Sequence, residues 1–135
     1  MQSIVRNLSF VFTAGALGGL ANSAALWGAG GVGLTGALGV AIAPSLTAAW
    51  LYPRLVWGAL WGLVFLLPFS RERWVARGLV ASLAPSLVQL FGVFPWQLNM
   101  SMLGLELGAL TPVVVLAVNA VWGVATSWWL RIAGR

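Results

Sequence analysis

The chain has 135 residues, a hydrophobic fraction of 61%, a charged fraction of only 7% and a formal net charge of +5. Soluble domains carry about 25% charged residues, so this composition indicates a membrane protein. Asp, Lys, His and Cys are absent, which excludes disulfides, thiolate or imidazole metal sites, and Cys or His nucleophiles. The arginines are scattered beside apolar segments and form no basic stripe for nucleic acid. We therefore expect no enzyme activity, no metal, no cofactor and no nucleic-acid partner.

Four apolar segments are long enough to cross the hydrocarbon core of a bilayer as helices, which takes about 20 residues each. They cover 8–28, 44–68, 78–97 and 112–131. The second begins at a Pro44-Ser45 pair and the fourth at Pro112, both suited to a helix start. We interpret the first as a retained span, although Arg6 and the small residues at 21–23 also fit a cleaved signal peptide. The predicted fold is one all-α membrane domain over 1–135, a four-span helical bundle.

The two connections at the end of the bundle opposite the termini, 29–43 and 98–111, are too apolar for ordinary solvated loops. They are also too short to cross the membrane and return. We expect each to be a short helical or re-entrant segment, since irregular backbone at membrane depth must be covered by protein or line a cavity. In an alternative interpretation, 31–52 is a fifth span, which leaves 55–69 short for a span and disturbs the distribution of arginines.

The arginines predict an orientation in the membrane. With four spans, six of them fall on one side, namely Arg6, Arg71, Arg73, Arg77, Arg131 and Arg135. The positive-inside rule then places both termini in the cytoplasm, and we expect the chain in a bacterial cytoplasmic (inner) membrane. Tryptophans fall near both ends of the spans, as in interfacial belts. They are Trp27, Trp50 and Trp96 at the outer ends and Trp74, Trp128 and Trp129 at the inner ends.

The two halves of the chain resemble each other weakly. Residues 15–26 can be aligned with 78–89, and 36–44 with 104–112, where glycine comes first and proline last in both. Two spans per half would make this a parallel two-fold repeat about an axis along the membrane normal. Chance similarity between apolar segments explains the resemblance equally well.

Each predicted span contains one strongly polar side chain in its outer half. Arg54 lies ten residues after Pro44, about 15 Å along a helix. Asn22, Gln89 and Asn119 lie six to eight residues from the outer ends of their spans, roughly 9–12 Å. A charge at this depth is costly, by about 2.5–3.5 kcal/mol on insertion scales, which makes Arg54 a candidate functional residue.

Helical spacing predicts that these polar residues lie on packing faces, each in a stripe with small residues. The stripes are Gly15, Gly18, Gly19 and Asn22; Arg54, Gly58, Trp61 and Gly62; Ser82, Pro85, Ser86 and Gln89; and Asn119, Gly123 and Thr126. Two of them contain the GxxxG spacing that lets membrane helices approach closely, Gly15/Gly19 and Gly58/Gly62. Glu106 is the only acidic residue within plausible reach of Arg54.

A purely structural interpretation also fits these residues. Asn and Gln often join membrane helices through hydrogen bonds of about 0.6 kcal/mol each, without any ligand. Arg54 can be neutralised by Glu106, by a carbonyl group that Pro53 leaves unbonded, or by extending outward to a lipid phosphate. The tryptophans fit anchoring and packing better than a cofactor site.

Two functions remain open. In the first, the chain is a small transporter, channel or receptor that binds or passes a small anionic or polar ligand in its outer half. The site residues would be Arg54, Glu106, Asn22, Gln89 and Asn119. The partners would be the lipid bilayer, a bound lipid or small anion, and copies of the chain in a homo-oligomer. In the second, the chain is a non-catalytic accessory or scaffolding subunit of a larger membrane complex.

Overall fold

The computed structural model describes residues 2–67, 72–97, 105 and 107–133, and every regular element in these ranges is helical. The elements are α1 (Gln2–Gly31), α2 (Leu34–Ala37), α3 (Ala48–Trp61), η1 (Gly62–Leu66), α4 (Trp74–Val88), η2 (Gln89–Gln97) and α5 (Thr111–Ile132). The short helix η1, which continues α3, is a 3-10 helix, and η2, which continues α4, is a π-helix.

Four stretches of the described chain are long and apolar enough to cross a membrane. They are Gln2–Gly31, Ala48–Leu66, Trp74–Val93 and Thr111–Ile132. This confirms an all-helical integral membrane protein with four candidate spans. The alternative with 31–52 as a fifth span is wrong, because residues 40–47 are not helical.

The second span begins later than the sequence predicts. Pro44 and Ser45 lie in extended chain, and the cap of α3 is Thr47, whose Oγ1 accepts a hydrogen bond from the Trp50 backbone N–H at 3.2 Å. Arg54 is therefore six residues, about 9 Å, from the start of its helix. This matches the depth predicted for Asn22, Gln89 and Asn119. The proline expected at the start of the fourth span, Pro112, does lie in the first turn of α5.

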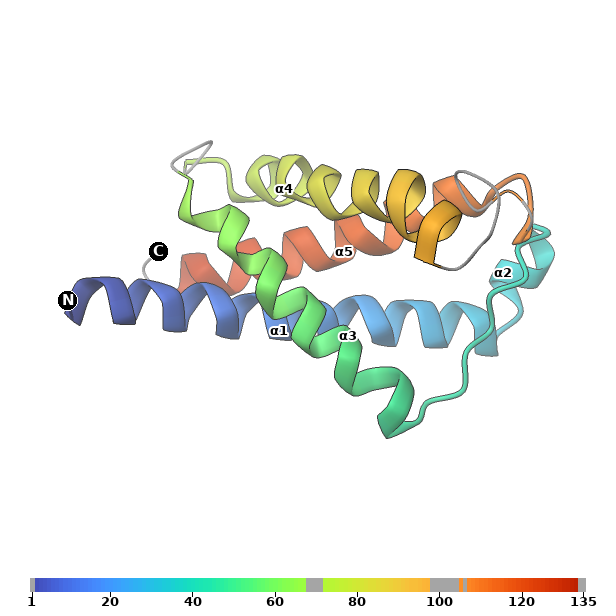
Figure 1. The fold of residues 1–135 in the computed structure, drawn as a ribbon, viewed down its shortest axis with the longest axis horizontal. Coiled ribbons are helices and arrows are strands. Elements are labelled where there is room, and N and C mark those ends of the chain that lie inside the picture. The colour runs from blue at the N-terminus through green and yellow to red at the C-terminus, as the bar shows by residue number, and fades with distance from the viewer. Residues whose placement is uncertain (1, 68–71, 98–104, 106, 134–135) are drawn as a thin grey trace.

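The helices pack in the order α3, α1, α5, α4. The extensive interfaces are those of α1 with α3, α1 with α5, and α4 with α5, whereas contacts between α3 and α4 are sparse. Figure 1 shows α1 and α5 running side by side and α3 crossing α1 obliquely. The two ends marked N and C lie at one end of the bundle, here called the termini end, and α2 lies at the other, the α2 end. The side between α3 and α4 is thus the open side of the bundle.

Glycines allow a close backbone crossing of α1 over α3. A Cβ atom on Gly58 would lie 2.7 Å from the carbonyl oxygen of Gly15, and one on Gly19 would lie 2.9 Å from that of Arg54. Both distances are shorter than real Cβ contacts allow, so backbone meets backbone here. The crossing brings the start of α3 within side-chain reach of the polar stretch of α1 around Asn22.

The predicted short segment at 29–43 contains one helical turn, α2, followed by extended chain. Its end contacts the second connection, since the Ala41 backbone N–H donates to the Leu107 carbonyl at 2.7 Å. Gly108 has a φ of 146° and lies directly against the Gly39 backbone, where no other residue fits. Residues 98–104 and 106, in the second predicted segment, lie outside the described residues.

The two-fold repeat stays a prediction. A parallel repeat would relate α1 to α4 and α3 to α5, so that the α1–α5 interface would have an equivalent between α4 and α3. That second interface is sparse, because α1 and α5 occupy the centre and α3 and α4 the outside. The helix packing therefore adds no support to the alignment of the halves.

Arg77 precedes the predicted third span, 78–97, but lies in the first turn of α4. It is 4% exposed, its Nη2 donates to the Phe65 carbonyl at 2.6 Å, and its guanidinium lies over the Phe65 ring at 5.1 Å. The charge at position 77 thus joins the start of α4 to the end of η1. Helix α4 begins at Trp74, four residues before the predicted start, because the apolar periodicity continues through this arginine.

The glycine crossing predicts opposite effects for two alanine substitutions in the same helix. Gly15→Ala places a methyl group against the Gly58 carbonyl and must separate α1 from α3, which we expect to destabilise the fold by about 1–3 kcal/mol. Gly28→Ala has open space around the new methyl group and should be neutral or stabilising by up to about 1 kcal/mol. Unfolding of both variants in bicelles measures the difference. Equal stability of the two variants would contradict the close crossing.

Candidate intramembrane polar site

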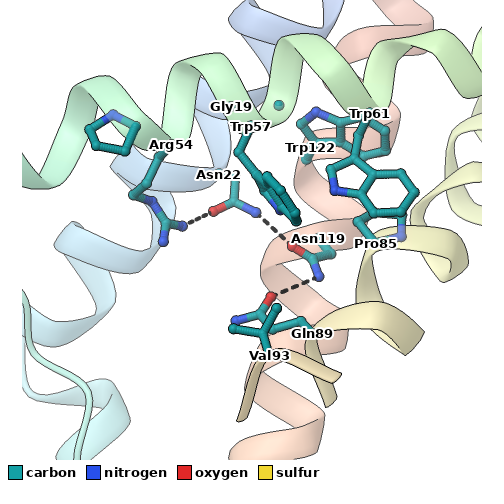
Figure 2. Close-up of a pocket in the computed structure, with 12 residues that line it drawn as sticks. Gly19, Asn22, Arg54, Trp57, Trp61, Pro85, Gln89, Val93, Asn119 and Trp122 are labelled. Carbon is teal, nitrogen blue, oxygen red and sulfur yellow. Dashed lines mark hydrogen bonds between the residues drawn. The ribbon is translucent and has the colours of Figure 1, made fainter. Parts of the chain in front are cut away.

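The polar side chains predicted from four separate spans meet in one hydrogen-bonded chain. Arg54 of α3 donates through Nη2 to the side-chain oxygen of Asn22 in α1. The Asn22 amide donates to Oδ1 of Asn119 in α5 at 3.0 Å, and the Asn119 amide donates to Oε1 of Gln89 in η2 at 3.4 Å. Figure 2 shows the four side chains in a line, joined by these three bonds. Each membrane-spanning segment supplies one member.

Arg54 is held mainly by α1. Its Nε donates to the Ser23 hydroxyl at 2.8 Å, and its guanidinium lies 4.8 Å from the centroid of the Trp50 ring. These contacts differ from the structural alternatives considered for the residue. The side chain turns toward α1, and its hydrogen bonds to Ser23 and Asn22 use no backbone carbonyl near Pro53. Among the described residues no carboxylate pairs with Arg54, and the only described acidic residue, Glu72, lies beside the start of α4.

The two asparagines at the centre of this series of hydrogen-bonded side chains are deeply buried, and their side-chain groups all form hydrogen bonds. Asn22 and Asn119 are 6% and 7% exposed, and Ser86, which accepts a bond from Asn119 at 3.0 Å, is fully buried. Asn22 also donates to the Val118 carbonyl at 2.9 Å. Arg54 and Gln89, the two ends, are only half-buried. The predicted packing faces of α1, α4 and α5 are therefore confirmed by burial, while that of α3 is partly open.

The direction of the hydrogen bonds follows from the chemistry of arginine. A guanidinium group can only donate, so Asn22 must present its oxygen to Arg54 and its NH2 group to Asn119. By the same reasoning, Asn119 presents its oxygen to Asn22 and its NH2 group to Gln89, which accepts through its side-chain oxygen. At the two ends of the chain, Arg54 Nη1 and the Gln89 amide nitrogen make no hydrogen bond to another described residue. The groups left over are donors, so the site is suited to a ligand that accepts hydrogen bonds.

A cavity of about 470 Å³ lies beside this chain, within the roughly 300–1,000 Å³ of small-molecule sites. Arg54, Asn22, Gln89 and Asn119 all line it (Figure 2). The remaining lining is apolar, with three tryptophans, two prolines, two glycines and a valine: Trp57, Trp61, Trp122, Pro53, Pro85, Gly19, Gly58 and Val93. Pro53 and Trp57 are also exposed on the outside of α3, so the cavity opens on the open side of the bundle.

The sequence analysis found the polar residues but missed their apolar surroundings. Glu106, the fifth predicted site residue, lies outside the described residues. Ser23, Trp57 and Trp122 were not predicted, whereas Trp61 was predicted to share the packing face of Arg54 but not as a site residue. Two of these tryptophans follow a site residue by three positions, Trp57 after Arg54 and Trp122 after Asn119, which puts each on the same helix face. That spacing is the signal that would have found them.

The donor set determines what the cavity can hold. The cavity lining offers one guanidinium and three amides, and the described residues contain no group of three His, Cys, Asp or Glu side chains for a metal ion. Guanidinium and amide N–H groups bind carboxylate and phosphate oxygens, with charge-assisted hydrogen bonds roughly twice as strong as neutral ones.

Replacing Asn119 by leucine tests whether the hydrogen-bonded chain is structural. The substitution removes bonds to Asn22, Ser86 and Gln89, and at about 0.6 kcal/mol for each we expect a loss of about 1–2 kcal/mol in unfolding free energy. The control is Asn7→Leu in α1, because the Asn7 side-chain oxygen accepts no hydrogen bond from the described residues. Unfolding of both variants in bicelles measures the effect. A change no larger for Asn119 than for Asn7 would mean that the chain contributes no stability.

No protein-family model, curated protein or solved structure matches this chain.

Proposed function

We propose that this protein binds or passes a small anionic or polar ligand at the membrane-embedded cavity around Arg54. The observation that carries the proposal is a guanidinium group that lines a cavity within a candidate span and has no carboxylate partner among the described residues. A charge in this position lowers the stability of the inserted chain, by about 2.5–3.5 kcal/mol on insertion scales. An anion in the cavity would offset that loss.

The hydrogen-bond direction supports an anion over a cation. The side-chain oxygens of Asn22, Asn119 and Gln89 each already accept a bond, and the two half-buried ends of the chain present N–H groups. A cation in the same place would face Arg54 and these donors. We therefore propose that the transporter, channel or receptor binds an anion. Glu106 remains a predicted member of the site.

An accessory role in a larger complex remains the second candidate. The open side between α3 and α4 supports it, because a partner helix could cover the exposed faces there. In that case Arg54 would pair with an acidic side chain of the partner. Gentle extraction from the native membrane followed by native mass spectrometry separates the two roles, since unrelated subunits in fixed ratio indicate a complex and a monomer or homo-oligomer with a bound small anion indicates a ligand site.

Arg54→Gln tests the ligand role directly. The substitution keeps two hydrogen-bonding groups but removes the charge, and we expect anion affinity to fall about 10- to 150-fold, the range for hydrogen bonds to charged groups. Binding is measured by calorimetry on the purified protein in nanodiscs, with chloride, acetate, phosphate and benzoate as probes. Arg6→Gln is the control, because Arg6 is exposed in the first turns of α1. Equal binding by Arg54→Gln and the wild type would exclude the site.

We also propose that both termini face the cytoplasm of a bacterial inner membrane. This rests on the positive-inside rule, since Arg6 lies near the start of α1, Arg73 directly precedes α4 and Arg131 lies in the last turn of α5. These three helix ends lie at the same end of the bundle (Figure 1). A fluorescent protein fused after residue 135 should fold and fluoresce in a bacterial host, whereas alkaline phosphatase fused there should be inactive. Alkaline phosphatase inserted at Gly36 should be active. The reverse pattern would overturn the orientation but not the fold.

A further inference from the structure

The cavity beside Arg54 has a polar part and an apolar part at different levels along the bundle. Arg54, Asn22, Gln89 and Asn119 lie at one level. Helix register then places the tryptophans about one turn nearer the termini end, because Trp57 follows Arg54 and Trp122 follows Asn119 in helices that run toward that end. Figure 2 shows Trp61, Trp122 and Pro85 grouped apart from Gln89 and Arg54.

The apolar part ends against packed core. Trp122 is 3% exposed, its indole Nε1 donates to the Gly15 carbonyl at 3.2 Å, and its ring meets Phe65 edge to face at 5.8 Å. Trp61 packs against the same buried cluster, which includes Val11, Ala14, Phe65, Ala81, Trp122 and Leu130. The cavity is thus blocked toward the termini end.

The side of the cavity is open. Trp57, in the middle of α3, is 49% exposed while it also lines the cavity, and its ring lies 5.9 Å from that of Trp61. Contacts between α3 and α4 are sparse. An apolar group can therefore enter between these helices from the hydrocarbon region without crossing water.

From these three features we infer that the cavity selects amphipathic anions, which carry a phosphate or carboxylate head and an unbranched or aromatic apolar body. The head binds the Arg54 guanidinium, which lines the cavity. The body lies along Trp57 and Trp61 and leaves through the gap between α3 and α4. This inference rests on the proposed function and specifies its ligand class.

The test compares two series of anions that differ only in apolar length. The probes are methyl, butyl and hexyl phosphate, and acetate, butyrate and hexanoate, titrated by calorimetry into the wild-type protein in phosphatidylcholine nanodiscs, with partition into empty nanodiscs subtracted. Burial of apolar surface predicts about fourfold tighter binding for each methylene group that enters the cavity. Hexyltrimethylammonium, the cation of matched length, should not bind.

Two variants locate the apolar body. Trp57→Ala should weaken hexyl phosphate by about fivefold or more while leaving methyl phosphate unchanged. Trp128→Ala is the matched control, because Trp128 is 50% exposed but lies in α5 outside the lining of this cavity. Circular dichroism and size-exclusion chromatography of both variants establish that they are folded. Equal weakening of the short and long probes by Trp57→Ala would overturn the placement of the apolar body.

The outcomes separate this inference from the proposed function. If all anions of a series bind equally and Arg54→Gln abolishes their binding, the anion site stands and selection of amphipathic ligands is wrong. If no anion binds, both are wrong. If affinity rises with apolar length and depends on Arg54, both the proposed function and this inference hold. Phosphatidic acid is then added to the nanodisc to determine whether the natural ligand is a lipid or a free amphiphile. Displacement of hexyl phosphate by that lipid indicates a lipid headgroup, and absence of displacement indicates a free amphiphile.

Discussion

The arrangement of this protein depends on the backbone contact between α1 and α3 at Gly15, Gly19 and Gly58. A guanidinium group in a bilayer must find hydrogen-bond acceptors within the protein, since lipid tails provide none. Arg54 finds them on α1, and it does so because the two helices touch without intervening side chains. A bulkier residue at the crossing would move Arg54 away from Asn22 and Ser23. The small residues therefore position the charge.

The same contact explains why the site is asymmetric. Helix α3 makes its extensive helix–helix interface with α1, so one face of the bundle has a helix that is anchored at its crossing and exposed along its outer side. On the other face, α4 and α5 make an extensive interface with its own glycine pair, Gly78 and Gly123. The cavity lies between a loosely flanked helix and a tightly packed pair. The packed pair α4 and α5, with η2, carries the amides of Gln89 and Asn119, and α3 carries the charge of Arg54.

Much of this could be predicted from the sequence, and the reason is the bilayer. Span number, the inward direction of Asn22 and Asn119, and the depth of the polar residues all follow from apolar length and helical spacing. The start of α3 was misplaced because Pro44-Ser45 has good capping chemistry, whereas the helix begins only at Thr47, after a stretch of extended chain. Burial of Arg77 could not be predicted, because an arginine beside a span is normally solvated and only the position of Phe65 in space provides its partner. The order of the helices around the bundle could not be predicted from the sequence either, since four apolar spans can pack in several ways.

The pairing of α1 with α5 has a consequence for biosynthesis. The first and fourth candidate spans form the central interface, and Asn22 receives its partner Asn119 only when α5 has inserted. Until then, within the described residues, the hydrogen-bond partners of Arg54 are Asn22 and Ser23 of α1. Membrane helices insert first and associate afterwards. Before α5 inserts, Asn22 therefore lacks the two hydrogen-bond partners that α5 supplies, Asn119 and the Val118 carbonyl.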